Sequence, residues 1–455
     1  MLYQKLARAG YHTYLGVIES GAASIGLTAS GSRTPRSQTV EKAVFAAPYN
    51  AGRNSVGNSA ASASIASWNE ALELPSGEVA HISVVTSSCG IVSDMDEVPV
   101  QLLDGGLGTT LEDNYKVRFT EATPLWSSHL LLSDPDRDTL TACQRSFAQV
   151  PVDVLLTATY QVSEEGFRRT RTDAYPDGVP RTDIPRFLDV AVSIVEQVKY
   201  PTTKLALSIG SYGAIMTPSQ EYTGQYDDNH NSIDTLYRWH ADRMSLFTSV
   251  PRLGSRVDFI AFETVPRLDE ILAIRRLTTP LSSQSADAAA SGPLLGRLPY
   301  WISCVFPGNA RALPDGSSIS KAVRALLSLE HSQDPPWGIG INCTKIAELP
   351  NLVKEYERSV RLLEEEDQLR SWPTLILYPD GTDGEVYDTA TKTWKMPIGL
   401  TETNHGRSWE KQLAHIVTEA RERGCWRSIV VGGCCKAGPE AISNLRAQVL
   451  HHSQA

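Results

Sequence analysis

The stretch Ser428-Ile429-Val430-Val431-Gly432-Gly433-Cys434-Cys435 joins a short apolar run to two adjacent cysteines. The run is typical of a strand that is buried on both faces. The two glycines allow the backbone to turn sharply where the thiols emerge. Earlier in the chain, Gly340-Ile341-Asn342-Cys343 has the same order, an apolar run followed by a cysteine. Three thiols at the ends of two strands indicate one metal site, in a fold that brings strand ends together.

Similar apolar runs recur from residue 98 onward, with helical patterns between most of them. The predicted strands are 99–103, 152–158, 204–209, 257–262, 300–305, 338–341, 374–378 and 428–431. The predicted helices are 123–132, 136–149, 187–198, 233–250, 268–277, 319–329, 352–365, 408–423 and 439–450. Buried strands that alternate with helices predict an α/β fold, a parallel (β/α)₈ TIM barrel. A doubly wound sheet is the alternative, but the stretch Asp104-Gly105-Gly106-Leu107-Gly108 does not fit its usual G-x-G-x-x-G loop.

The first 97 residues differ from the rest of the chain. Residues 29–36 and 52–67 are rich in Ser, Ala, Gly and Asn and lack sustained periodicity. Such segments bury too little apolar surface to offset the entropy that is lost on ordering. We therefore expect residues 1–97 to be an N-terminal extension, largely disordered or poorly folded, and residues 98–455 to form the barrel domain. A mis-predicted leading exon is an alternative origin for the extension.

The composition argues against a nucleic-acid-binding protein and against a membrane protein. The chain has a formal net charge of -10 and a pI of about 5.6, which argues against binding to nucleic acid or to an anionic membrane. It contains no apolar run of the ~18 residues that a membrane span requires. We expect a protein with no nucleic-acid or membrane partner, acting as a monomer or weak oligomer.

The cysteines and the N-terminal residues indicate in which cellular compartment the protein acts. Several cysteines lie in or beside apolar runs, as reduced cysteines of cytoplasmic proteins commonly do. The N-terminus lacks a basic segment followed by an apolar one, so we expect no secretory signal. Arg8, Arg33 and Arg36 lie among Ser and Ala and leave a mitochondrial presequence open, although Glu19 and Glu41 weaken it. A cytoplasmic location is the prediction.

The ends of the predicted strands carry many polar and soft side chains. In a parallel barrel these ends open into one mouth, where active sites lie. The side chains are Asp104, Tyr160, Gln161, Ser211, Glu263, Asn342, Cys343, Tyr378, Cys434 and Cys435. We therefore expect the active site at this mouth.

Cys343, Cys434 and Cys435 are the predicted metal ligands. They could instead be small buried hydrophobic residues, as free cysteines often are. A disulfide between Cys434 and Cys435 is disfavoured, because neighbouring Cα atoms lie about 3.8 Å apart and unstrained disulfides need about 4.4–6.8 Å. Three thiolates suit Zn²⁺ and leave its fourth position open, which is the catalytic pattern. Such a site favours a substrate thiol as fourth ligand, held as a thiolate that attacks an electrophilic carbon.

The motifs at these strand ends resemble those of the homocysteine S-methyltransferase family. The motifs occur in order: Asp104-Gly105-Gly106-Leu107-Gly108-Thr109-Thr110-Leu111-Glu112, Trp126-Ser127, Tyr160-Gln161, Glu164-Glu165-Gly166-Phe167, Gly210-Ser211-Tyr212-Gly213-Ala214, Glu221-Tyr222-Thr223-Gly224, Phe262-Glu263-Thr264, Gly340-Ile341-Asn342-Cys343-Thr344 and Gly432-Gly433-Cys434-Cys435. The resemblance runs from about residue 100 to the C-terminus. It implies a zinc-containing barrel that methylates homocysteine to methionine, with the three cysteines as catalytic zinc ligands.

The resemblance also implies the residues that bind the substrate. Asp104 and Glu263 match the positions expected to hold the ammonium group of homocysteine, and backbone amides around Gly105 and Gly106 its carboxylate. Asn342, beside the first cysteine, is grouped with them as a substrate-binding residue. Taken alone, Asp104 fits an Asx turn before glycines, and Glu263 fits a salt bridge at the barrel rim.

The methyl donor is left open between S-methylmethionine and S-adenosylmethionine. Only about twenty residues follow Cys435, too few for the C-terminal arm of the betaine-using branch, and no cobalamin or folate module follows. A sulfonium donor is therefore favoured. The alternatives are selenocysteine or selenohomocysteine as methyl acceptor, or a non-catalytic zinc- or thiol-binding barrel. A zinc hydrolase would call for His and carboxylate zinc ligands, which are missing from the predicted ligand set.

Overall fold

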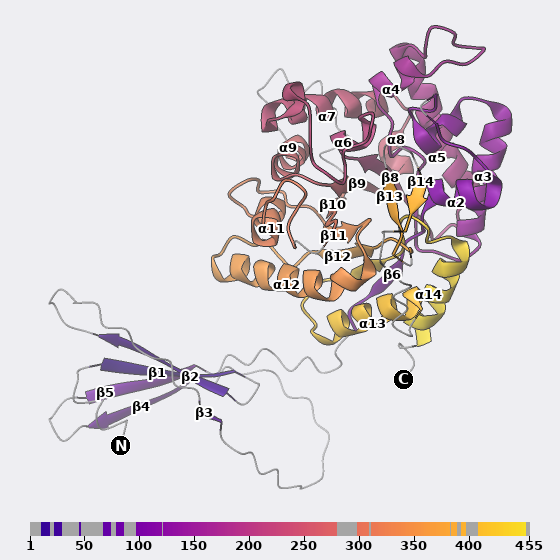
Figure 1. Cartoon of the computed structure of the whole chain (residues 1–455). Helices are drawn as coiled ribbons and strands as arrows, with labels where there is room; N and C mark the ends of the chain where they lie inside the picture. Colours follow the sequence, from indigo (N-terminus) through magenta and orange to yellow (C-terminus); the bar gives the residue numbers. More distant parts are fainter. Residues whose placement is uncertain are drawn as a thin grey trace. The chain divides into compact units, whose positions relative to one another are not determined.

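The computed structural model describes residues 97–120, 122–279, 298–308, 311–382, 384–388, 393–396 and 408–451. It also describes the backbone of residues 11–18, 22–29, 45–46, 67–73 and 79–85. The chain divides into two compact units, Met1–Asp96 and Glu97–Ala455 (Figure 1).

The first unit contains antiparallel strands. The order β1 (Tyr11–Ile18), β2 (Ala22–Ala29), β3 (Phe45–Ala46) forms one sheet, and β4 (Ser67–Glu73) pairs with β5 (Val79–Val85). The sequence did not predict these strands. The expectation of poor order for the other residues up to 96 lies outside the described residues.

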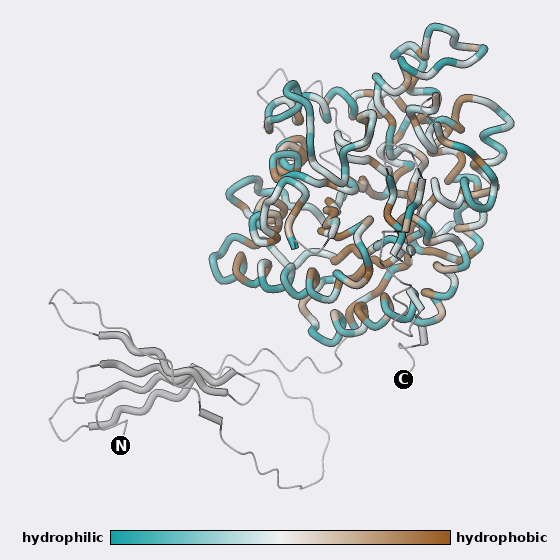
Figure 2. Tube along the Cα trace, viewed as in Figure 1, coloured by the Kyte–Doolittle hydropathy of each residue, from teal (hydrophilic) through white to brown (hydrophobic). Residues whose placement is uncertain are grey.

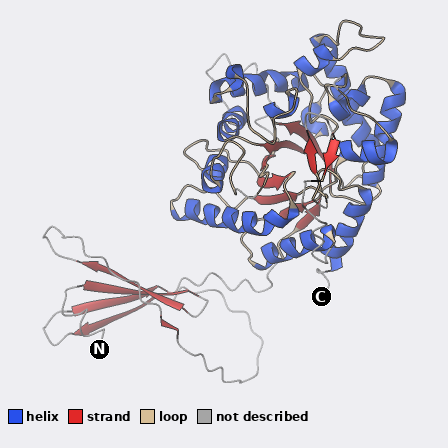
Figure 3. Ribbon diagram, viewed as in Figure 1, coloured by secondary structure: helices blue, strands red, loops and turns tan. Residues whose placement is uncertain are grey.

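The second unit is built on an eight-stranded parallel sheet that closes on itself. In sheet order the strands are β6 (Val100–Leu102), β15 (Ile429–Val431), β12 (Thr374–Tyr378), β11 (Gly338–Asn342), β10 (Tyr300–Cys304), β9 (Phe259–Val265), β8 (Lys204–Gly210) and β7 (Val154–Leu156). A parallel bridge between Leu103 and Val154 joins the last strand to the first. The predicted (β/α)₈ barrel is therefore confirmed, with helices around the strands (Figure 3).

The helices that follow the strands cover the outside of the sheet. They are α2 (Leu107–Tyr115), α3 (Asp134–Ala148), α4 (Glu164–Arg169), α5 (Ile184–Val198), α6 (Tyr212–Ile215), α7 (Ile233–Thr248), α8 (Leu253–Arg256), α9 (Leu268–Thr278), α11 (Ile319–Leu327), α12 (Leu349–Glu365), α13 (Trp409–Glu422) and α14 (Pro439–His451). Short 3₁₀ turns are η1 (Trp126–Leu131), η2 (Arg181–Asp183), η3 (Asp228–His230) and η4 (Ile346–Glu348). The helix predicted over 123–132 is thus a 3₁₀ segment, and α2 was missed. None of the helices in the described part of the chain is long and apolar enough to cross a membrane.

Two layers of apolar side chains hold the barrel together. One lies between the strands and the helices, whose polar faces point outward (Figure 2). The other fills the inside of the barrel and consists of Leu103, Val154, Ala206, Ala261, Trp301, Ile376, Tyr378 and Val430. Because the interior is packed, the barrel has a solid floor, and a substrate can enter only at the mouth.

A hairpin adds to the mouth after β12. It consists of β13 (Val386–Asp388) and β14 (Thr393–Lys395), paired antiparallel. The sequence did not predict it.

Candidate active site

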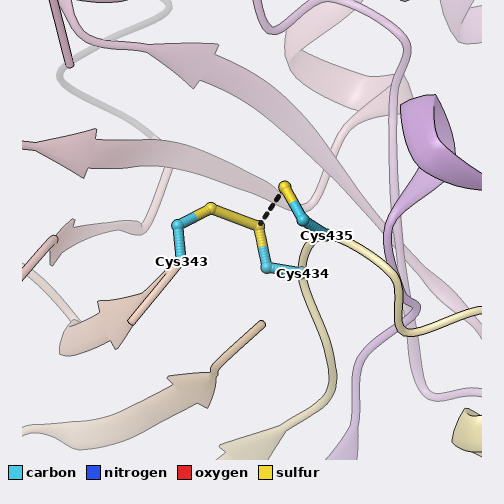
Figure 4. A group of neighbouring side chains, drawn as sticks. All are labelled: Cys343, Cys434 and Cys435. Atoms are coloured by element: carbon cyan, nitrogen blue, oxygen red, sulfur yellow. Dashed lines mark hydrogen bonds between the residues drawn. A yellow bond between two sulfur atoms is a disulfide. The ribbon is translucent and has the colours of Figure 1, made fainter. Parts of the chain in front are cut away.

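The structure brings the three predicted thiols together at the mouth. Cys343 follows β11, and Cys434 and Cys435 follow β15 (Figure 4). Their sulfur atoms all lie within 4.8 Å of one another. Cys343 and Cys434 are joined in a disulfide with a Cα–Cα distance of 5.6 Å, a pairing the sequence did not predict. Cys435 is free, with its Sγ 4.0 Å from that of Cys434, so no bond links the two neighbours, as expected.

Once reduced, this cluster fits zinc. Tetrahedral thiolates at about 2.3 Å from a zinc ion lie roughly 3.8 Å from one another, near the 4.0 Å between Cys434 and Cys435; Cys343 and Cys434 reach that spacing only when their disulfide is reduced. Burial raises the pKa of the Cys435 thiol to about 12. A thiol in that environment becomes a thiolate only beside a strong positive charge, such as a bound metal ion. Among the described residues, this is the one group of His, Cys, Asp or Glu side chains with a metal-binding spacing.

Glycines let the first and last strand ends pack backbone against backbone. A Cβ on Gly105 would lie 2.1 Å from the Ala437 carbonyl oxygen, and one on Gly106 would lie 2.3 Å from that of Cys434. The Gly106 amide donates to the Ala437 carbonyl at 3.0 Å. That amide is therefore engaged within the protein rather than free to bind a carboxylate. What these glycines provide is close contact between the Asp104 loop and the Cys434 loop.

Asp104 and Glu263 are buried and face the same cavity, with exposed fractions of 4% and 5%. Oδ2 of Asp104 accepts a hydrogen bond from the Leu156 amide at 2.9 Å, whereas Oδ1 is buried without a partner. Oε1 of Glu263 accepts from the Ser208 hydroxyl. Burial raises the pKa of Asp104 well above its ordinary value, and the charge of Glu263 adds to this. Burial likewise raises the pKa of Glu263 to about 7.

No ion pair with a described Lys, Arg or His side chain is found for either acid. The salt bridge considered for Glu263 is therefore absent from the described part of the chain. Two buried carboxyl groups that lack a counter-ion and face a cavity form a site for a cation.

The cavity has a volume of about 460 Å³, the size of a site for a small molecule. All the predicted site residues line it: Asp104, Gly105, Gly106, Glu263, Asn342, Cys343, Cys434 and Cys435. Of the other strand-end candidates, Tyr160, Gln161 and Tyr378 also line it, whereas Ser211 does not. Four carboxylates line the cavity, those of Asp104, Glu112, Glu221 and Glu263, and no Lys, Arg or His is among its described lining residues. The described lining therefore favours a cationic ligand over an anionic one.

Sequence reasoning missed several of these lining residues. Glu221 and Tyr222 lie in a motif that was noticed, but neither was given a role. Tyr387 and Trp394 come from the β13–β14 hairpin. The motif that contains Glu221 could have identified this acid as a site residue. The hairpin strands are short, and their sequence does not distinguish them from a surface turn.

Comparisons with known proteins identify the family of this chain. Residues 101–449 match the family model described as Homocysteine S-methyltransferase. The chain belongs to the homocysteine S-methyltransferase family. Homocysteine S-methyltransferase YbgG from Bacillus subtilis is 26% identical over 366 residues, covering 78% of this chain and 95% of that protein. Betaine-homocysteine S-methyltransferase from Drosophila melanogaster is also 26% identical, covering 78% and 95%.

A solved structure supports the fold of this family member. The metallated form of the homocysteine methyltransferase MmuM from Escherichia coli superposes with a TM-score of 0.52 at 20% identity. The match covers 77% of this chain and 96% of MmuM. It supports the barrel fold.

Proposed function

We propose that the protein transfers a methyl group from a sulfonium donor, S-methylmethionine or S-adenosylmethionine, to the thiol of homocysteine, giving methionine. One observation carries the proposal: three clustered thiols and two unpaired buried acids line one cavity that has no cationic side chain among its described residues. Homocysteine has a soft thiol for the first group and an ammonium for the second.

Cys343, Cys434 and Cys435 would hold Zn²⁺ as thiolates. Zinc bound there would lower the pKa of the homocysteine thiol, which then stays ionised at neutral pH. The thiol proton passes to solvent as the substrate binds.

Asp104 and Glu263 bind the ammonium group in this proposal. The cation would neutralise two carboxylates that otherwise repel each other, so binding lowers both of their raised pKa values. In this proposal the carboxylate of homocysteine lies at the N-terminus of α2. The first turn of this helix lines the cavity, and no side chain caps it. Helix N-termini attract anions through their unpaired amides. Asn342 acts as a positioning residue, because both polar atoms of its side chain are bonded to Thr264.

The chemical step forms a bond between the homocysteine sulfur and the methyl carbon. The bond from that carbon to the sulfonium sulfur breaks, and its electron pair stays on the departing sulfur, which leaves as a neutral thioether. Since an anion and a cation become two neutral thioethers, exclusion of water by the cavity favours the step. The cavity also has to hold the two sulfurs and the methyl carbon in line.

Betaine is the runner-up donor. It is also cationic, and a betaine-homocysteine S-methyltransferase has the same 26% identity to this chain as YbgG. A selenol acceptor, selenocysteine or selenohomocysteine, would fit the same thiol-binding position. A non-catalytic zinc-binding barrel gives no role to the unpaired acids. The cytoplasmic location and the monomeric or weakly oligomeric state remain predictions.

The test is methyl transfer to homocysteine by the reduced, zinc-loaded protein. S-methylmethionine, S-adenosylmethionine and betaine are supplied separately, and methionine is measured. We expect methionine from one or both sulfonium donors and none from betaine. Transfer from betaine alone, or from none of the three, would refute the proposal.

A further inference from the structure

A third buried acid in the cavity, Glu221, is not used by the binding of homocysteine. Its exposed fraction is 6%, and its Oε2 atom is buried without a hydrogen-bond partner. Burial raises the pKa of Glu221 to about 7. No Lys, Arg or His is among the described residues that line the cavity, so a positively charged ligand would favour the ionised form of this carboxyl group.

Glu221 lines the same cavity as Asp104 and Glu263 but comes from another segment, the loop between α6 and η3. The charge of Glu263 acts on Asp104, whereas burial, its own backbone and Ser219 account for the pKa of Glu221. The phenol of Tyr160 lines the same cavity, and after burial the charges of both Glu221 and Glu263 raise its pKa, so it is near both acids. The cavity is thus lined by acids from different segments of the chain, with the Tyr160 ring near both Glu221 and Glu263.

Three aromatic rings line the cavity together with Glu221. Besides burial, its charge acts on the phenols of Tyr160, Tyr222 and Tyr387, and raises the pKa of each. All three rings line the cavity, and Tyr387 comes from the β13–β14 hairpin. A carboxylate among aromatic rings is a favourable setting for a sulfonium cation, because the ring faces attract positive charge.

The loop that carries Glu221 is firmly held. The Gln220 amide donates to the Gly213 carbonyl at 2.8 Å, and a Cβ on Gly213 would lie 2.8 Å from the Glu221 nitrogen. At the ends of the loop, the Tyr212 amide donates to Glu270 at 2.6 Å, and the Tyr226 hydroxyl donates to the same carboxylate. These hydrogen bonds and close contacts therefore fix the position of Glu221 in the cavity.

The neighbour of Glu221 reaches the thiol cluster. The side chain of Tyr222 forms a hydrogen bond with Cys435, the free thiol of the cluster. A ligand beside Glu221 is therefore close to the position where the acceptor sulfur is expected. This is where a methyl donor has to lie for in-line transfer.

We propose that Glu221, with the rings of Tyr160, Tyr222 and Tyr387, forms the subsite that binds the positive charge of the sulfonium methyl donor. This inference rests on the proposed function. It divides the charges of the cavity between the two substrates: Asp104 and Glu263 take the acceptor, and Glu221 takes the donor.

Calorimetry on the full-length, zinc-loaded protein without homocysteine tests the subsite directly. The probes are S-methylmethionine, S-adenosylmethionine and methionine, a neutral analogue that lacks one methyl group and the sulfonium charge. We expect Glu221→Gln to weaken binding of at least one sulfonium probe tenfold or more, and to lose most of the preference for S-methylmethionine over methionine. Glu221→Asp, which keeps the charge, should retain more of the affinity, and thermal unfolding of each variant checks that it folds.

The matched control is Asp104→Asn, which removes a different carboxylate from the same cavity. It should raise the KM for homocysteine, whereas Glu221→Gln should leave that KM within about twofold of wild type. Three results would overturn the subsite. Glu221→Gln could bind the sulfonium probes as wild type does, it could lose affinity for homocysteine alone, or the wild-type protein could bind neither sulfonium probe. Failure of the proposed function gives another result: sulfonium binding that depends on Glu221, without transfer to homocysteine.

Discussion

Asn342 and Thr264 are joined by two hydrogen bonds across the mouth of the barrel. The Thr264 amide donates to Asn342 Oδ1 at 2.9 Å, and Asn342 Nδ2 donates to Thr264 Oγ1 at 2.7 Å. Their strands, β11 and β9, are separated by β10. Thr264 follows Glu263, Cys343 follows Asn342, and both Thr264 and Cys343 have left-handed backbone, with φ of 57° and 47°. The pair therefore holds Glu263 and the Cys343 thiol at a fixed spacing. It also stabilises a left-handed backbone at Thr264 and Cys343 that residues other than glycine rarely adopt.

Replacing Asn342 by Ala should loosen that spacing. The Thr264 amide would be left buried without a partner, so we expect the free energy of unfolding to fall by about 1–3 kcal/mol. Zinc affinity should fall roughly ten- to a hundredfold, as when partners that orient metal ligands are lost. Denaturant unfolding and competition with a chelator measure the two effects. Ser359→Ala is the control, since it removes a 2.8 Å hydrogen bond within α12 and should leave zinc affinity unchanged.

Two glycines beside the thiol loop provide a matched pair of variants. Gly105→Ala would place a Cβ 2.1 Å from the Ala437 carbonyl, whereas the nearest atom to a Cβ on Gly438 is Thr110 Oγ1 at 3.7 Å. We expect Gly105→Ala to lower the Tm and the zinc affinity, because the loop that bears Cys434 must move. Gly438→Ala should resemble wild type in both. Equal behaviour of the two variants would show that the close contact at Gly105 is unimportant.

Asp104→Asn tests the assignment of the acceptor ammonium. The variant keeps an oxygen that can accept from the Leu156 amide but loses the charge. We expect the KM for homocysteine to rise tenfold or more, with a smaller change in the KM for the donor. Steady-state kinetics with each substrate varied in turn measures this. A rise in the donor KM alone would reverse the assignment.

The pKa of Glu263 predicts how stability depends on pH. Burial raises this pKa from 4.5 to about 7, so the folded protein retains a proton that the unfolded chain has lost. The stability that this group contributes is therefore fully present below about pH 4.5 and is lost as the pH rises through about 7. In Glu263→Gln the free energy of unfolding should fall less over that range. Denaturant unfolding of the ligand-free proteins across it gives the comparison, and an equal fall in both would argue against an ionising Glu263.

Much of the barrel could be predicted from the sequence because its strands are short apolar runs buried on both faces. The same logic located Asp104, Glu263 and Cys343, since a residue that ends a parallel strand must face the mouth. The closing bridge between Leu103 and Val154 agrees with that prediction.

The remaining features depend on contacts that no local pattern records. The Cys343–Cys434 disulfide requires the ends of β11 and β15 to meet, which only the closed sheet shows. Asn342 was grouped with substrate contacts, but its partner Thr264 lies on a strand two places away in the sheet. Glu221 is placed by a loop whose anchor is Glu270, a helix residue far along the chain.

Zinc titration of the metal-free protein tests the central claim most directly. The protein is first reduced, because two of the three sulfurs cannot bind zinc while they form the disulfide. The account predicts that methyl transfer from a sulfonium donor to homocysteine rises with added zinc and saturates at about one zinc per chain. Cys434→Ala should bind zinc weakly and stay inactive, whereas Cys143→Ala, which alters a buried cysteine of the helix layer, should follow wild type. Full activity in the reduced, metal-free protein, or in Cys434→Ala, would contradict the account.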